Sequence, residues 1–377
     1  MMAMRIPLCI PSVGAKEEAA VLTALRSGWV APAGPQLDEF ESWLADITGR
    51  SHAVAVSSGT AALHLSLLVQ GIGLGDRVAV STLTFAATVN ALHYVGAEPV
   101  FIDCDESGLM DVAVLEAACA DSLASSRPIR AVVPVDLYGR PADYLRIGQI
   151  ASIYGAVVIS DAAESLGASL EGEPAGSFGA VAALSFNGNK IITTSSGGAV
   201  LCSDSETADR VRYLSTQARQ PVVHYEHTEV GYNYRLSNLL AALGLAQLER
   251  LDEIVAVKRS HHRAYDETLS GYNGMQVLDA GDGNCWMSVL VVDPESGTDA
   301  WSLSESLLRR GVETRPVFKP MHLQPVHEGC DRRYITGRAE ELFQTGLALP
   351  SSTDLRPEDR NQVVAEIAAL VEEAVGV

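Results

Sequence analysis

The sequence lacks features that mark several classes of protein. It has no stretch approaching the roughly 20 apolar residues of a membrane span, and its start, MMAMRIPLCIPSVG, lacks the apolar region of a signal peptide. Basic residues are few, since 27 Lys and Arg against 47 Asp and Glu give a net charge of -20. Because nucleic acid is bound by a basic face, this balance argues against such a partner. We expect a soluble, cytoplasmic protein with small-molecule ligands.

Metal-binding and disulfide patterns are absent as well. The six cysteines form no CxxC pair and no metal spacing with histidine. His224 and His227 flank Glu226 in a segment without clear periodicity, which is poor evidence for zinc. We therefore expect reduced thiols, a reducing compartment and no bound metal.

Apolar strands alternate with helical segments through the first half of the chain. The strands include HAVAV, EPVFIDCD, IRAVVPVDLYG and VVISDAAES. This order predicts an α/β fold in which helices cover both faces of a mostly parallel sheet. Strand signals at SVLVVDP and VETRPVF, mixed with helices, indicate a smaller C-terminal α+β domain. We expect a large domain over residues 1–250, N-terminal helices included, and a small domain over residues 251–377.

Several strand ends carry side chains suited to one ligand. Ligands of open parallel sheets bind beyond the carboxyl ends of the strands, where Phe85, Asp161 and Lys190 would gather. A lysine that forms a Schiff base and an aspartate that holds a pyridinium nitrogen are the protein groups that pyridoxal phosphate chemistry needs. Taken singly, Lys190 reads as a surface lysine, Asp161 as a helix cap and Phe85 as a core aromatic. The pairing of lysine and aspartate favours the cofactor.

Two further features suit anionic groups. Ser57 to Thr60 connect a strand to an apolar helix, where free amides, a hydroxyl and a glycine make an anion cradle. A plain helix cap explains the same residues equally well. A basic cluster near the C-terminus suits the phosphates of a nucleotide, although a solvated charged face is the alternative. Its members are Arg309, Arg310, Arg315, Lys319 and His322, with Arg332 and Arg333 further on.

A family resemblance covers nearly the whole chain. It is carried, in order, by SSGTAAL, TFAAT, FIDCD, DLYGRPAD, SDAAESLGA, SFNGNK with GGAV, and GYNYRLSNLLAALGLAQLERLD. The sequence resembles the nucleotide-sugar aminotransferases of the DegT/DnrJ/EryC1/StrS group, which implies the aspartate aminotransferase fold (fold type I) and pyridoxal 5′-phosphate as cofactor. A narrower resemblance, to the branch that aminates C4 of UDP-4-keto-6-deoxy-N-acetylglucosamine on bacillosamine-type routes, lies in SFNGNKIITTSSGG, STQAR, HYEHTEVGYNYRLSN and ETRPVFKPMH.

The resemblance implies a role for each candidate residue. Lys190 would bind the cofactor covalently and then move a proton between the cofactor and sugar C4. Asp161 would hold the pyridine nitrogen, Glu164 would lie near the 3-hydroxyl side of the ring, and Phe85 would pack on the ring. The remaining implied contacts are Gly59, Thr60 and Ser185 to the phosphate, Asn233 from the other subunit of a homodimer, and, most loosely, Arg315, Lys319 and His322 to the nucleotide sugar.

The implied reaction is ping-pong amino transfer from L-glutamate to a UDP-linked 4-keto sugar. Amination at C3, or of a dTDP-linked sugar, would use the same cofactor residues. A pyridoxamine-phosphate-dependent sugar dehydratase is disfavoured, because such relatives have histidine in place of Lys190. A non-catalytic sensor that binds the cofactor is a further alternative. Two departures leave the substrate open: Ser195 and Ser196 stand where many relatives have an acidic residue, and Asp136 stands where many have histidine.

Overall fold

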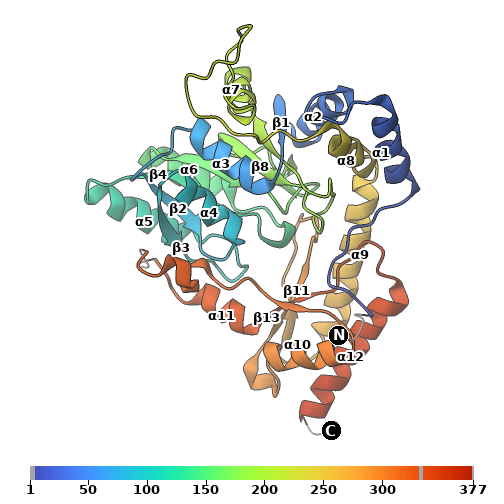
Figure 1. Ribbon diagram of the computed structural model, residues 1–377. Helices are drawn as coiled ribbons and strands as arrows, with labels where there is room; N and C mark the ends of the chain where they lie inside the picture. Colours follow the sequence, from blue (N-terminus) through green and yellow to red (C-terminus); the bar gives the residue numbers. More distant parts are fainter. Residues whose placement is uncertain (1–4, 331–333, 376–377) are drawn as a thin grey trace.

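Two sheets organise the chain in the computed structural model, which describes residues 5–330 and 334–375 (Figure 1). The larger sheet has seven strands in the order β1-β9-β8-β5-β4-β2-β3. These strands are β1 (His52–Val56), β2 (Arg77–Ser81), β3 (Glu98–Ile102), β4 (Ile129–Val133), β5 (Val157–Asp161), β8 (Val181–Ser185) and β9 (Gly198–Cys202). A separate hairpin joins β6 (Ser169–Leu170) to β7 (Glu173–Pro174).

Strand β9 alone in the larger sheet runs antiparallel to its neighbours, β1 and β8. The other pairings, from β8 through β5, β4 and β2 to β3, are parallel. The carboxyl ends of β5 and β8 therefore lie side by side at the same edge of the sheet. The predicted α/β fold with a mostly parallel sheet is confirmed.

Helices cover both faces of the larger sheet (Figure 1). Alternation along β1 sends Val54 and Val56 into one core, and Ala53 and Ala55 into the other. The first core contains α3 (Gly59–Val69), α4 (Ala86–Tyr94) and α7 (Ser205–Ser215). The opposite face packs against α2 (Pro35–Thr48), α5 (Val112–Ala124), α6 (Tyr144–Tyr154) and α8 (Asn238–Leu248), while α1 (Ala15–Ser27) packs on α8.

The C-terminal part forms a second, antiparallel sheet in the order β10-β11-β13-β12. Its strands are β10 (Met275–Val277), β11 (Ser288–Val292), β12 (Arg315–Pro316) and β13 (Gly346–Leu349). The helices of this part are α9 (Leu251–Leu269), α10 (Ala300–Arg309), α11 (Arg338–Thr345) and α12 (Pro357–Val375). Short 3-10 turns lie at Leu137–Gly139, Pro294–Ser296, Met321–Leu323 and Pro325–His327.

The first described residues pack against this second sheet rather than the first. Ile6 pairs with Val312 and is buried in the core that contains β10, β11 and β13. The amide of Ser351 donates to the carbonyl of Leu8 at 2.7 Å. The chain thus contacts the C-terminal layer before it enters α1, and the division near residue 250 stays a prediction. None of the helices in the described ranges combines the length and apolar character needed to cross a membrane.

Candidate active site

Lys190 lies on the loop that follows β8. Its amide closes a turn by donating to the carbonyl of Asn187 at 3.0 Å. The side chain is 12% exposed, and its Nζ lies 3.2 Å from Oε1 of Glu164. The same Nζ sits 4.1 Å from the centre of the Trp286 ring. The amine is therefore held out of solvent between a carboxylate and an aromatic face, unlike an ordinary surface lysine.

Asp161 is the last residue of β5 and is buried. Its Oδ2 accepts a hydrogen bond from the Thr88 hydroxyl at 2.7 Å, and its Oδ1 accepts one from the Ala163 amide at 3.2 Å. Burial raises the pKa of Asp161, and these hydrogen bonds together with the charge of Lys190 oppose that rise. A buried carboxylate in this state gains stability from any cation placed against it.

Glu164 is buried beside Lys190. While Oε1 faces the amine, Oε2 accepts a hydrogen bond from the Tyr138 amide at 2.8 Å. Burial raises the pKa of Glu164, and the charge of Lys190 is the largest opposing effect. Glu164 thus supplies a fixed acceptor for the amine of Lys190.

Asp161, Glu164 and Lys190 open into one cavity of about 360 Å³ at the carboxyl ends of β5 and β8. A set of small and hydroxyl side chains lines another part of the wall: Ser58, Gly59, Thr60, Ser185, Ser196 and Gly197. This set surrounds the start of α3, where the Ser58 hydroxyl caps the helix by accepting from the Ala61 amide at 3.0 Å. The preceding amides have no acceptor within the helix, so they can face an anion.

Steric crowding explains why position 59 in this wall is glycine. A Cβ built on Gly59 would lie 2.8 Å from Cβ of Ser185, closer than real Cβ contacts. The start of α3 and the end of β8 therefore approach as closely as backbone allows. A phosphate bound there would meet helix amides and the hydroxyls of Ser185 and Thr60, so this end of the cavity fits the phosphate of the cofactor.

Aromatic residues form the remaining wall. Phe85, at the start of α4, lines the cavity although it is 59% exposed. Its ring centre lies 6.0 Å from that of Phe318, and Trp286 completes the apolar side. An exposed aromatic above a polar cavity floor is suited to cover a flat ring. The cavity therefore fits pyridoxal phosphate, because it combines a phosphate cradle, a buried acid, a lysine and an aromatic cover.

Other predicted residues lie outside this cavity. Asn233 is exposed and does not line it; the prediction that it reaches a second subunit's site requires a partner chain. Lys319 is exposed and also lies apart. Arg315 lines an adjoining cavity of about 300 Å³, which shares Trp286 and Phe318 with the first.

His322 is only 1% exposed and is engaged on both ring nitrogens. Its Nδ1 lies 2.6 Å from the Thr82 hydroxyl, and its Nε2 lies 2.9 Å from Oε1 of Glu340. The ring thus joins the segment after β2 to helix α11. This position is structural, and we do not propose His322 as a substrate contact.

The predicted basic cluster is dispersed. Arg309 and Arg310 pair with Glu305 and Glu366, on helices α10 and α12. Among the members that the structure describes, Arg315 borders a cavity next to the site, and it pairs with Glu313 at 2.8 Å. Arg332 and Arg333 lie outside the described residues. Within the residues that are described, no group of three His, Cys, Asp or Glu side chains is arranged to hold a metal.

Comparison with known proteins identifies the family. A model of the DegT/DnrJ/EryC1/StrS aminotransferase family matches residues 11–368. The chain belongs to this family. It is 38% identical over 367 residues to EpsN of Bacillus subtilis, which carries the name of a pyridoxal phosphate-dependent aminotransferase, with 96% of this chain and 94% of EpsN covered. It is also 37% identical over 369 residues to the GDP-perosamine synthase of Caulobacter vibrioides, covering 96% and 97%.

Solved structures of aminotransferases have the same fold. A family member from Brucella abortus superposes with a TM-score of 0.88 at 31% identity, covering 94% of this chain and 95% of the other. The sugar aminotransferase Spr1654 of Streptococcus pneumoniae, in its pyridoxal phosphate form, gives 0.89 at 25% identity over 98% and 99%. The protein is thus a pyridoxal phosphate-dependent sugar aminotransferase of fold type I, as the sequence predicted.

Several residues of the site were not predicted from the sequence. Thr88, which was not singled out, donates a hydrogen bond to Asp161. Trp286 and Phe318 come from the C-terminal part and close the cavity. Thr88 lies in the TFAAT segment already singled out, so its position one helical turn after Thr84 was a usable signal; Trp286 precedes a strand with no such pattern.

Proposed function

We propose that this aminotransferase moves the amino group of L-glutamate to C4 of a UDP-linked 4-keto-6-deoxy-N-acetylhexosamine. The product is the UDP-4-amino-4,6-dideoxy-N-acetylhexosamine. The observation that carries amino transfer is the buried Lys190 amine, placed beside Glu164 in a cavity that also contains Asp161. When bound, pyridoxal phosphate supplies an electron sink for charge that develops at the reacting carbon.

Three side chains would act on the cofactor ring, each in a different role. Asp161, kept ionised, would hold the ring nitrogen in its protonated form. Lys190 would bind the cofactor covalently and, once released, carry a proton between the cofactor and the sugar carbon. Glu164, at 3.2 Å, would fix the lysine when it is free and lie at the side of the ring that bears the 3-hydroxyl.

The other contacts hold the ligands in place. Gly59, Thr60 and Ser185 would bind the phosphate, and Phe85 would cover the ring. Arg315, beside the adjoining cavity, and Lys319 are the candidates for the nucleotide sugar. These contacts would hold the cofactor and the nucleotide sugar in position for the reaction.

The nucleotide and the position of amination are supported by sequence likeness. The segments SFNGNKIITTSSGG and ETRPVFKPMH support the UDP-linked C4 substrate. A relative from Shewanella sediminis, 32% identical, is named a UDP-4-amino-4-deoxy-L-arabinose–oxoglutarate aminotransferase. A GDP-linked 4-keto sugar is the second candidate, because the 37% identical relative is named for GDP-perosamine.

The substrate is tested by incubating the enzyme with L-glutamate and 4-keto and 3-keto sugars linked to UDP, GDP or dTDP. NMR of the product identifies the carbon that carries the amine. We expect the UDP-linked 4-keto sugar to give the highest kcat/KM. A preference for the GDP-linked sugar would support the second candidate, and amination at C3 would refute the first.

Lys190→Ala tests the catalytic assignment itself. We expect this variant to lose turnover while it still binds pyridoxamine phosphate, because the cradle and Asp161 remain. Normal turnover in the variant would contradict the role of Lys190. A protein that binds the cofactor at Lys190 but leaves glutamate unchanged would instead be a sensor.

We propose a homodimer in which Asn233 of one copy completes the cavity of the other. Mixing Lys190→Ala and Asn233→Ala proteins tests this arrangement. A mixed dimer contains one site with both native residues, so activity should reappear on mixing. If the mixture stays inactive, or if the protein is a monomer by light scattering, the shared site is wrong.

A further inference from the structure

The segment Asn284–Trp286 bridges the two loops that carry the acidic residue and the lysine. It belongs to the C-terminal part and lies just before β11. On one side it contacts the loop of Glu164, and on the other the loop of Lys190.

Asn284 fixes this segment to the loop of Glu164. Its Nδ2 donates to the carbonyls of Glu164 and Leu166 at 2.8 and 2.9 Å. Its Oδ1 accepts from the Trp286 amide at 2.8 Å. The side chain is fully buried, so each lost bond would leave a buried carbonyl or amide unpaired.

Trp286 in turn fixes the loop of the lysine. Its indole Nε1 donates to the carbonyl of Asn189 at 2.6 Å, and Nζ of Lys190 lies over the ring. The carbonyl of Asn189 also accepts a weak contact from Cys9 Sγ at 3.5 Å, and the turn is closed by the bond from the Lys190 amide to Asn187. A Cβ on Gly188 would meet no atom within 4 Å, so packing does not hold the loop there.

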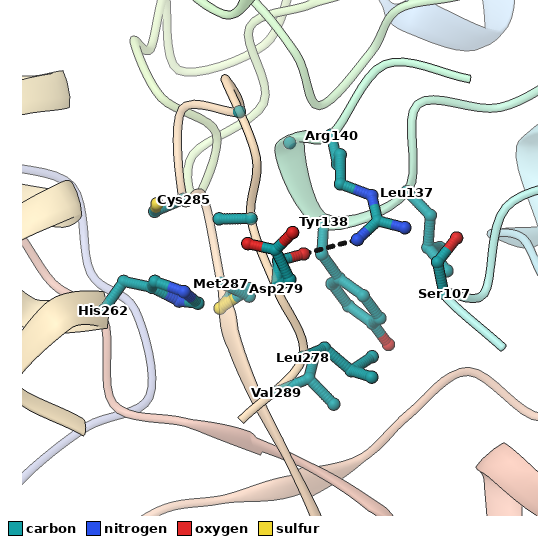
Figure 2. A pocket seen from close by; sticks show the side chains of 13 residues that line it. Ser107, Leu137, Tyr138, Arg140, His262, Leu278, Asp279, Cys285, Met287 and Val289 are labelled. Atoms are coloured by element: carbon teal, nitrogen blue, oxygen red, sulfur yellow. Dashed lines mark hydrogen bonds between the residues drawn. The ribbon is translucent and has the colours of Figure 1, made fainter. Parts of the chain in front are cut away.

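The backbone at Cys285 gives the indole its direction. Cys285 is in the left-handed region at φ 55, which is uncommon for a residue other than glycine. Cys285 and Met287 line a small cavity of about 30 Å³ with Tyr138 and Arg140 (Figure 2), whereas Trp286 lines the catalytic cavity. The alternation turns Trp286 alone toward the lysine.

We infer that Trp286 is a positioning residue for Lys190. The indole N–H holds the loop carbonyl next to the lysine, and the ring face limits where Nζ can lie. The amine is thereby aimed at the carbon that it must attack. This inference rests on the proposed role of Lys190.

The test uses Trp286→Phe, which keeps an aromatic face but removes the N–H donor. Cofactor-depleted enzyme is mixed with pyridoxal 5′-phosphate, and covalent attachment at Lys190 is followed by visible absorbance and by borohydride trapping with peptide mapping. Binding of pyridoxamine phosphate, which forms no bond to lysine, is measured in parallel. Trp301→Phe is the matched control, because Trp301 is 42% exposed on α10.

We expect Trp286→Phe to slow covalent attachment at Lys190 about fivefold or more, because the variant loses one buried hydrogen bond. Its affinity for pyridoxamine phosphate should stay unchanged, and Trp301→Phe should match the unaltered enzyme in both measurements. An unchanged or faster attachment rate would overturn the inference. A parallel fall in pyridoxamine phosphate affinity would also overturn it, because Trp286 would then only maintain the cavity. Absence of attachment at Lys190 in the unaltered enzyme would instead refute the proposed function.

Discussion

The buried carboxyl of Asp136 makes the stability of the folded protein fall as pH rises, and one substitution should remove this dependence. The side chain is completely buried; its Oδ1 accepts from the Ala142 amide at 3.0 Å and the Tyr144 hydroxyl at 2.7 Å, and its Oδ2 accepts from the Ser165 hydroxyl at 2.5 Å. Burial raises the pKa of Asp136 from 3.8 to about 7, and these three donors oppose that rise only in part. The folded protein therefore binds a proton at this site that the unfolded chain releases near pH 4.

The sign of the effect follows from the raised pKa. A protonated Asp136 contributes stability that is fully present below about pH 4 and is lost as pH rises through about 7. A difference of about 3 pKa units corresponds to about 4 kcal/mol, at 1.36 kcal/mol per unit. Asp136→Asn is neutral at every pH, keeps an acceptor for Ala142 and Tyr144, and lets the Ser165 hydroxyl accept from the new amide. The variant should therefore gain stability relative to the unaltered protein as pH rises.

Denaturant unfolding between pH 4 and pH 8 measures this difference. The free energy of unfolding of Asp136→Asn minus that of the unaltered protein should increase by about 4 kcal/mol over the window and then level off. Infrared spectra should also show a protonated carboxyl band that titrates near pH 7 and is missing from the variant. The exposed Asp209, changed to Asn, is the control and should show neither effect. Parallel stability curves for both proteins would refute the reasoning.

Two other substitutions and one control test the cofactor cradle and the scaffold separately. Gly59→Ala places a Cβ 2.8 Å from that of Ser185, so affinity for pyridoxamine phosphate should fall about tenfold or more by titration, without loss of the fold. Glu41→Ala removes the carboxylate that lies 2.5 Å from Arg235, whose side chain is 8% exposed, and leaves this cation only the Ala55 carbonyl among the described residues; the loss should cost about 3 kcal/mol in denaturant unfolding. Lys16→Ala breaks only an exposed ion pair and should cost less than about 1 kcal/mol. Equal losses for Glu41→Ala and Lys16→Ala would contradict this account.

The sequence predicted the parts of the site that depend on strand order. Asp161 ends one short apolar strand and Lys190 follows another, and the parallel pairing of β5 and β8 brings those ends together. The cradle at Gly59 also follows from a local pattern, a strand followed by a capped helix. Such residues could be found because their position is set by the element that contains them.

Residues fixed by distant segments could not be found in this way. Trp286 reaches the lysine from a loop almost a hundred residues later, and the bend at Cys285 that aims it has no glycine to signal it. His322 looked like part of a basic cluster, but Thr82 and Glu340 bury it from both sides. The segment AEELFQTGL predicts a helix, but its last two residues, Gly346 and Leu347, begin strand β13 directly after helix α11.

The two buried acids of the site, Glu164 and Asp161, differ in how their negative charge is compensated. Glu164 has its cation in Lys190, whereas the hydrogen bonds that Asp161 accepts come from neutral groups, a hydroxyl and an amide. Burial raises the pKa of both acids, so without a second positive group Asp161 remains the less compensated of the two. Under the proposed function, a protonated ring nitrogen would supply that positive charge at Asp161, and Glu164 would stay paired with the lysine. The two acids are therefore not interchangeable: Glu164 faces the amine of Lys190, whereas Asp161 accepts its hydrogen bonds from neutral groups.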